Sequence, residues 1–155
     1  IENILENQDK DCICMDNYTC QIFRDEMDYL SSDVSDSNSI AFIPLRIAMN
    51  FFERSRSNFI GGPDVLRKMQ NEDNVVWVVT SVDDASVVLS DGNAKCGQHI
   101  RAYEEVTVKS NVSIKRKGGV LEFQQVLMNS REERLAQAAI TIWCLDANTR
   151  RPKKA

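Results

Sequence analysis

One stretch of the chain has apolar residues at helical spacing and predicts a long helix over residues 41–60. Wound at 3.6 residues per turn, the segment places an apolar stripe on one face, made of Leu45, Met49, Phe52, Phe59 and Ile60. Pro44 fits such a helix only in its first turn, and Asn38 or Ser39 is the expected N-cap. Arg56 falls near the middle of the stripe, so a cation occupies a face that a helix normally buries.

From residue 74 onward the pattern changes to the alternation that is typical of β-strands. It is clearest over residues 105–115, where one face is predicted to carry Val106, Val108, Val112 and Ile114. Further strands are predicted from β-branched and alternating segments over residues 18–29, 74–89, 120–128 and 135–146.

The remaining segments complete the expected organisation. Residues 61–70, with Pro63 near their start, predict a short second helix. Residues 30–39 predict a polar loop, and residues 1–17 a loosely ordered lead-in to a single domain over residues 18–155. The order of strand, long helix and antiparallel meander predicts an α+β fold in which the helix and one curled sheet bury each other's apolar faces. The uncovered face and edge of that sheet lead us to expect a homodimer or homotetramer.

Composition and charge narrow the classes of function. The chain has 155 residues, of which 43% are hydrophobic, enough for the core of one domain. No apolar run approaches the roughly 20 residues that cross a bilayer, so no membrane partner is expected. The net charge of −4 argues against general nucleic-acid binding. Bases concentrate in residues 114–119 and 149–155, which form either a solvated turn and tail or a docking patch for an acidic partner.

The five cysteines and the single histidine favour neither a disulfide framework nor a metal site. An odd cysteine count without a visible secretory signal leads us to expect reduced thiols in the cytoplasm. Cys12 and Cys14 do not have the spacing of a zinc site, so no metal or cofactor is expected. Cys96 and His99 are close in sequence, but Gly97 between them is typical of a loop, which disfavours a cysteine–histidine nucleophile pair.

Several segments resemble one family of enzymes. The helix segment FFERSR, residues 51–56, resembles the Trp-Phe-Glu-Arg-Ala-Arg signature of the 4-hydroxybenzoyl-CoA thioesterase-like family. The segments LAQAAITIWCLD, residues 135–146, and LDANTRRP, residues 145–152, resemble that family's final strand and its exit turn. The resemblance covers about residues 20–153 and implies the hotdog fold, in which an antiparallel sheet wraps a long central helix.

The resemblance also implies a site. Family members usually carry an Asp-x-Asp segment before the helix, and its second Asp is often the nucleophile or general base. Counted back from FFERSR, this segment begins at Asp36, and Asn38 stands in place of the catalytic Asp. Ala41 stands where the family has Gly, and Ile47–Ala48 replace an Asn-Tyr pair. Thioesterases of enediyne polyketide pathways also have Asn here and pair it with a helix arginine, which Arg56 matches at the same spacing.

This resemblance implies a thioesterase that releases an acyl or polyketide chain from a carrier protein or CoA, with Asn38 and Arg56 polarising the carbonyl. An unpaired guanidinium in a core is costly, so Arg56 must form an ion pair, reach water or line a cavity. One interpretation is an ion pair with Glu53, one turn away. The other is a cation facing a thioester, with Asp36 or Glu53 assisting the attacking water. Asn38 is then either a second donor or simply the N-cap.

Other residues are expected to contact the substrate. Backbone N–H groups near the predicted helix start, at Ile40, Ala41 and Phe42, are candidates for part of the oxyanion site. Phe52 and Phe59 are either core residues or the lining of an acyl pocket. Three basic residues are candidates for contacts with the phosphopantetheine phosphate or with an acidic carrier protein. They are Lys115, Arg116 and Lys117.

Two alternatives to a thioesterase follow from the same residues. The first is a dehydratase or acyl-transfer domain of a polyketide synthase, for which His99 is the only candidate histidine. The second is a non-catalytic acyl-binding or scaffold domain that has lost its catalytic acid. The replacements at Asn38, Ala41 and Ile47–Ala48 favour this second alternative.

Overall fold

Five long strands form one antiparallel sheet in the order β1-β5-β6-β7-β4. The structure is a computed structural model that describes residues 12–29, 41–88 and 100–153. The strands are β1 (Cys12–Gln21), β4 (Val75–Val87), β5 (Glu105–Lys115), β6 (Val120–Met128) and β7 (Arg134–Asp146). A separate short pair joins β2 (Asp28–Tyr29) to β3 (Ala41–Phe42). Single 3-10 turns follow β1 and β5, at Arg24–Glu26 and Arg116–Gly118.

The alternating pattern correctly predicts which face of the central strands is buried. In β5, Val106, Val108 and Val112 are fully buried and Ile114 is 4% exposed. The predicted ranges of β5 and β6 coincide with the observed strands, and β4 and β7 differ from prediction by only a few residues at their ends. Alternation is informative here because side chains at i and i+2 lie on the same face of a strand.

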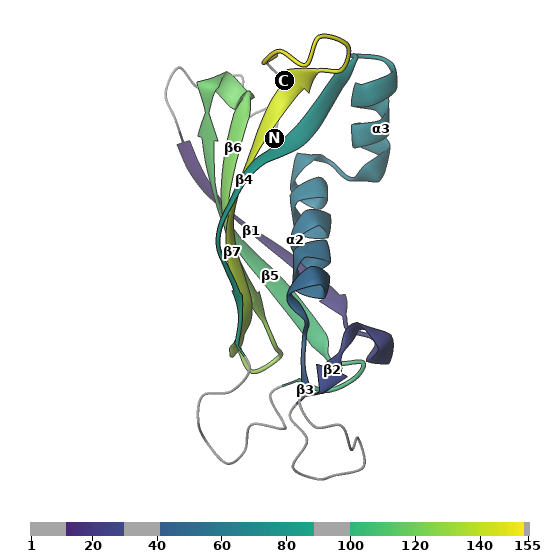
Figure 1. Cartoon of the computed structure of the whole chain (residues 1–155), viewed down its shortest axis with the longest axis vertical. Helices are drawn as coiled ribbons and strands as arrows, with labels where there is room; N and C mark the ends of the chain where they lie inside the picture. Colours follow the sequence, from purple (N-terminus) through teal and green to yellow (C-terminus); the bar gives the residue numbers. More distant parts are fainter. Residues whose placement is uncertain (1–11, 30–40, 89–99, 154–155) are drawn as a thin grey trace.

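Two helices lie on one side of the sheet (Figure 1). Helix α2 (Leu45–Ile60) runs along the twisted sheet and contacts all five of its strands. Helix α3 (Pro63–Asn71) begins with Pro63, as predicted, and packs against α2 and β4. Gly61 separates the two helices with φ of +138°, and a Cβ at this position would meet the Val65 side chain at 3.0 Å. This is a turn that favours glycine over any residue with a side chain.

The long helix begins at Leu45, so the predicted start at residue 41 is wrong. Pro44 is the N-cap, with φ of −59° and ψ of 149°, and Ala41–Phe42 are extended and pair with β2. The residue before a proline is disfavoured in the helical region, which prevents the helix from extending back through Ile43. The N-cap predicted at Asn38 or Ser39 is therefore also wrong.

The first strand begins at Cys12 rather than at residue 18 and ends at Gln21. Residues 12–17, expected in the lead-in, pair with β5, from Cys12 opposite Ile114 to Asn17 opposite Lys109. Polar residues such as Asp16 and Asn17 conceal the alternation in the sequence. The pairing with β5 nevertheless satisfies those backbone groups of this segment that face β5.

The order of the strands departs from a simple meander. Strands β5, β6 and β7 pair in sequence, but β4 pairs with β7 and lies at one edge, while β1 lies at the other. Consecutive strands are often, but not always, neighbours in a sheet. The local sequence pattern therefore predicted the strands but not the position of β4 within the sheet.

The core lies between α2 and the facing side of the sheet. Its largest fully buried side chains include Phe51, Phe52 and Phe123. No described helix has the length and apolar character that a bilayer-spanning segment requires. Within residues 12–29, 41–88 and 100–153, no cluster of three or more His, Cys, Asp or Glu side chains could hold a metal ion.

Candidate active site

Helix α2 carries Arg56 into the core. Its buried residues recur at helical spacing and are Ile47, Ala48, Phe51, Phe52, Ser55, Arg56 and Ile60. Arg56 is only 7% exposed and Ser55 only 1%, so two polar residues lie on the face that packs against the sheet. The predicted stripe is correct for Phe52 and Ile60 but wrong for Leu45, which is 38% exposed.

A hydrogen-bonded chain connects Arg56 to the sheet. Nη1 of Arg56 donates to Oε1 of Gln125 at 3.0 Å. Nε2 of Gln125 lies 3.2 Å from both the Phe52 carbonyl oxygen and the Ser110 hydroxyl oxygen, and donates to each. The hydroxyl oxygens of Ser110 and Ser55 are 3.5 Å apart. Helix and sheet are thus joined by buried polar groups that satisfy one another.

The charge of the Arg56 guanidinium is not balanced by an ion pair in the part of the chain that the structure describes. No ion pair among the described residues includes Arg56, so the salt bridge with Glu53, one of the two interpretations of Arg56, is not formed, and Glu53 is exposed. Burial lowers the pKa of Arg56, and the negative charge of Glu53 opposes part of that effect. Arginine remains protonated in proteins despite such a shift, so the site holds a buried positive charge.

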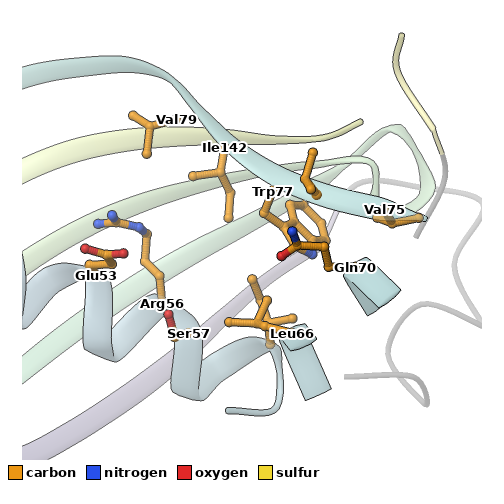
Figure 2. Close-up of a pocket in the computed structure, with 11 residues that line it drawn as sticks. Glu53, Arg56, Ser57, Leu66, Gln70, Val75, Trp77, Val79 and Ile142 are labelled. Carbon is orange, nitrogen blue, oxygen red and sulfur yellow. The ribbon is translucent and has the colours of Figure 1, made fainter. Parts of the chain in front are cut away.

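Arg56 lines a cavity of about 250 Å³ between the helices and strands β4 and β7. Figure 2 shows Glu53 and Arg56 together at one end, with Leu66, Gln70 and Trp77 toward the other. The remaining lining residues are Ser57, Ile60, Val75, Val76, Val79 and Ile142. The walls are mainly apolar, and a few polar groups converge on them, which is the usual composition of a ligand pocket.

The structure brings together only some of the predicted catalytic residues. Arg56 and Glu53 line the same cavity. Asp36, Asn38 and Ile40 lie outside the described residues, so their predicted roles remain predictions. Ala41 and Phe42 are in β3 and not at the helix start, so the first-turn backbone N–H groups belong to Leu45 and the residues after it.

The predicted substrate-binding aromatics belong to the core. Phe52 is fully buried, and Phe59 packs edge-on against Phe123 with ring centroids 5.7 Å apart. Neither is among the residues that line the Arg56 cavity. The apolar lining comes instead from α3, β4 and β7, which only the three-dimensional packing brings beside α2.

The predicted basic residues lie away from the cavity, at the turn between β5 and β6. Lys115 pairs with Glu122 at 2.9 Å, and the Arg116 guanidinium stacks 4.6 Å from the centre of the Trp143 ring. Trp143 alternates with the buried Ile142, so Arg116 lies on the face of the sheet opposite Arg56. None of Lys115, Arg116 and Lys117 lines the Arg56 cavity.

Sequence reasoning missed three polar residues near this site. Gln125 alternates with Phe123 and Leu127 on the buried face of β6, a signal that marks it as a buried polar residue. Trp77 lines the cavity, and its indole nitrogen is buried without a hydrogen-bond partner among the described residues. Asp16, opposite Ser110 in the sheet, has a buried Oδ2 that likewise lacks a described partner, and burial raises the pKa of its carboxyl.

Comparison with known proteins gives structural matches alone: no protein-family model matches the chain, and no curated protein matches its sequence. A 1,4-dihydroxy-2-naphthoyl-CoA thioesterase from Synechocystis superposes with a TM-score of 0.64 at 7% identity, covering 91% of this chain and 89% of its own. A DHNA-CoA thioesterase from Staphylococcus aureus gives 0.61 at 15% identity, covering 90% and 80%.

An acyl-ACP thioesterase from Bacteroides thetaiotaomicron gives a TM-score of 0.59 at 14% identity, covering 91% of this chain but 49% of that protein. This chain therefore corresponds to about half of that larger enzyme. The five-stranded antiparallel sheet and its helices match the fold of all three proteins, in agreement with the expected hotdog fold. The chain therefore shares the fold of known thioesterases.

Proposed function

We propose that this chain is a hotdog thioesterase that hydrolyses an acyl or polyketide thioester of CoA or a carrier protein. The observation that carries the proposal is the buried Arg56 guanidinium, which lines a mainly apolar cavity and has no carboxylate partner among the described residues. The shared fold supports it, because the matching structures include CoA and ACP thioesterases.

The chemistry needs a positive group close to the thioester carbonyl. Water adds to the carbonyl carbon and creates a tetrahedral intermediate whose oxygen carries negative charge. Collapse of the intermediate breaks the carbon–sulfur bond, the thiolate takes up a proton, and a carboxylic acid and a free thiol remain. A fixed donor aimed at that oxygen typically lowers the barrier by about 2.7–4 kcal/mol.

Arg56 would supply this donor, with Asn38 as the second one. The apolar walls around Trp77, Leu66 and Ile142 would hold the acyl chain. Glu53 lines the same cavity, and its carboxylate is the described group best situated to accept a proton from the attacking water. In this proposal, α2 is the central helix that the sheet wraps, and a second copy of the chain covers the β4 edge, giving a homodimer or homotetramer.

A thiol-release assay tests the proposal. Wild-type protein is incubated with a panel of acyl-CoA and acyl-carrier-protein substrates, and free thiol is measured alongside Arg56→Ala, Asn38→Ala and Arg54→Ala. Arg54 is a matched control, because it lies on the same helix with its side chain 52% exposed. Loss of release in the Arg56 and Asn38 variants, with activity retained in the Arg54 variant, supports the mechanism. Full activity of Arg56→Ala would rule it out.

A second candidate function is a non-catalytic acyl-binding domain. Ile47 and Ala48, which replace a polar pair of the family, are core residues with 8% and 0% exposure, so they offer no polar contact to a substrate. The same panel separates the two functions, because binding of acyl thioesters without release of thiol would favour the acyl-binding domain.

A further inference from the structure

Among the described residues, the side chain that hydrogen-bonds to Arg56 is neutral. Gln125 is 1% exposed, and its side-chain oxygen accepts the guanidinium hydrogen bond at 3.0 Å. Its amide nitrogen is held by two acceptors, the Phe52 carbonyl oxygen and the Ser110 hydroxyl oxygen. With the nitrogen engaged on that side, the amide oxygen is turned toward Arg56. Gln125 is therefore fixed from both the helix and the sheet.

A neutral acceptor has a different effect from a carboxylate. Buried guanidinium groups are usually compensated by an ionised partner, which removes most of the field that an incoming ligand would feel. An amide oxygen accepts a hydrogen bond and orients the guanidinium without cancelling its charge. Glu53 also lines the cavity, but it is exposed, so water and salt screen its charge.

The cavity beside Arg56 is suited to a ligand that is apolar along most of its length and negative at one end. Its walls include Leu66, Trp77 and Ile142, and it measures about 250 Å³. The guanidinium has five N–H donors, and Gln125 occupies one of its nitrogens. The remaining donors can bind an oxyanion or a carboxylate.

We propose that Gln125 is the positioning residue for Arg56, and that its neutrality keeps the positive charge available to an anionic group in the cavity. The anionic group is the oxyanion of thioester hydrolysis or the carboxylate of the released acid. For the oxyanion, the inference rests on the proposed function. Binding of the carboxylate does not depend on turnover.

The test compares two substitutions of similar size with a control on the neighbouring residue. Gln125→Glu introduces a carboxylate beside Arg56, and Gln125→Met removes the acceptor without adding charge. Gln124→Glu makes the same charge change at the next residue, which is exposed on the opposite face of β6. Binding of octanoate and of uncharged 1-octanol is measured by calorimetry, together with kcat and KM for octanoyl-CoA and the urea unfolding of each variant.

We expect Gln125→Glu to bind octanoate at least about tenfold more weakly than wild type, with 1-octanol affinity unchanged. The introduced carboxylate would form an ion pair with the Arg56 guanidinium and so compete with the carboxylate of octanoate. Its kcat should fall by about 100-fold, the lower end of the loss from one oxyanion donor, while KM changes little. Gln125→Met should lie between wild type and Gln125→Glu in octanoate affinity. Gln124→Glu should behave as wild type. Urea unfolding checks that Gln125→Glu is folded, because its carboxylate gains an ion pair with Arg56 but loses the donor to the Phe52 carbonyl oxygen.

The inference is overturned if wild type does not bind octanoate, or if Gln125→Glu keeps wild-type affinity for it. An equal loss in Gln124→Glu, or an equal loss of 1-octanol binding, would also overturn it. If Gln125→Glu does not fold, Gln125→Met decides: unchanged kcat and octanoate affinity in that variant contradict a positioning role. Absence of thiol release by wild type would refute the proposed function, whereas the octanoate series would still decide the role of Gln125.

Discussion

Replacement of Arg56 by Met should lower the activity of the protein without lowering its stability. Methionine keeps an unbranched side chain of good helix propensity and removes the charge. In the structure, Arg56 is 7% exposed and its described hydrogen bond is to the neutral Gln125. A residue retained for stability would be expected to have an ionic partner, so we expect the variant to lose turnover and to stay folded.

The magnitudes follow from these contacts. Losing the bond leaves Oε1 of Gln125 buried and without its partner, which costs about 1–3 kcal/mol. Removing a buried guanidinium that has no ion-pair partner among the described residues recovers a desolvation penalty of several kcal/mol. The free energy of unfolding should therefore stay the same or rise by up to about 2 kcal/mol, raising Tm by up to roughly 8 °C for a chain of this size. The kcat should fall by about 10²–10³.

Urea unfolding, monitored by circular dichroism, measures the free energy of unfolding, and thiol release from octanoyl-CoA measures kcat. Arg54→Met is the control, because Arg54 lies on the same helix and its nearest carboxylate contact, with Glu26, is 3.9 Å long. A kcat within twofold of wild type would refute the catalytic assignment. A loss of more than about 3 kcal/mol of stability would instead identify Arg56 as a structural anchor of the core.

Three further predictions concern other residues. Val79→Trp should raise KM for acyl thioesters in steady-state kinetics, because Val79 lines the cavity and is 46% exposed. Val82→Trp is the control, because Val82 is 45% exposed and does not line the cavity. The same KM in both variants would contradict the cavity as the acyl site. Burial raises the pKa of Asp16, so the folded state binds its proton more tightly, and stability falls as pH rises through the unfolded and then the folded pKa. Asp16→Asn should therefore be more stable than wild type toward urea at neutral pH, and this difference should shrink in acid, where Asp16 is protonated. A stability difference that is the same at both pH values would show that the charge of the Asp16 carboxylate is not its cause. Burial raises the pKa of Cys144 to about 11, so its thiol should react with DTNB only after unfolding. Rapid labelling of Cys144 in the native protein, with the labelled residue identified by mass spectrometry, would contradict this prediction.

Much of the secondary structure could be predicted because it depends on local patterns. The alternation of Val106, Val108 and Val112 gave the buried face of β5. Pro63 marked the start of α3. The start of α2 was misplaced because Pro44 was assigned to the first turn, although the restraint that proline places on Ile43 favours an N-cap. The pairing of β4 with β7 could not be predicted, because periodicity within a strand carries no information about its neighbour.

The sequence by itself determined that a cation lies on the buried stripe of a long helix, because residue spacing in a helix fixes which side chains share a face. Only the tertiary structure decided what that cation meets. Gln125 is 69 residues away from Arg56 along the chain, and the cavity walls come from α3, β4 and β7. Contacts between segments so distant in sequence arise from the packing of whole elements, so the neutral partner and the hollow beside it became visible only in the folded chain.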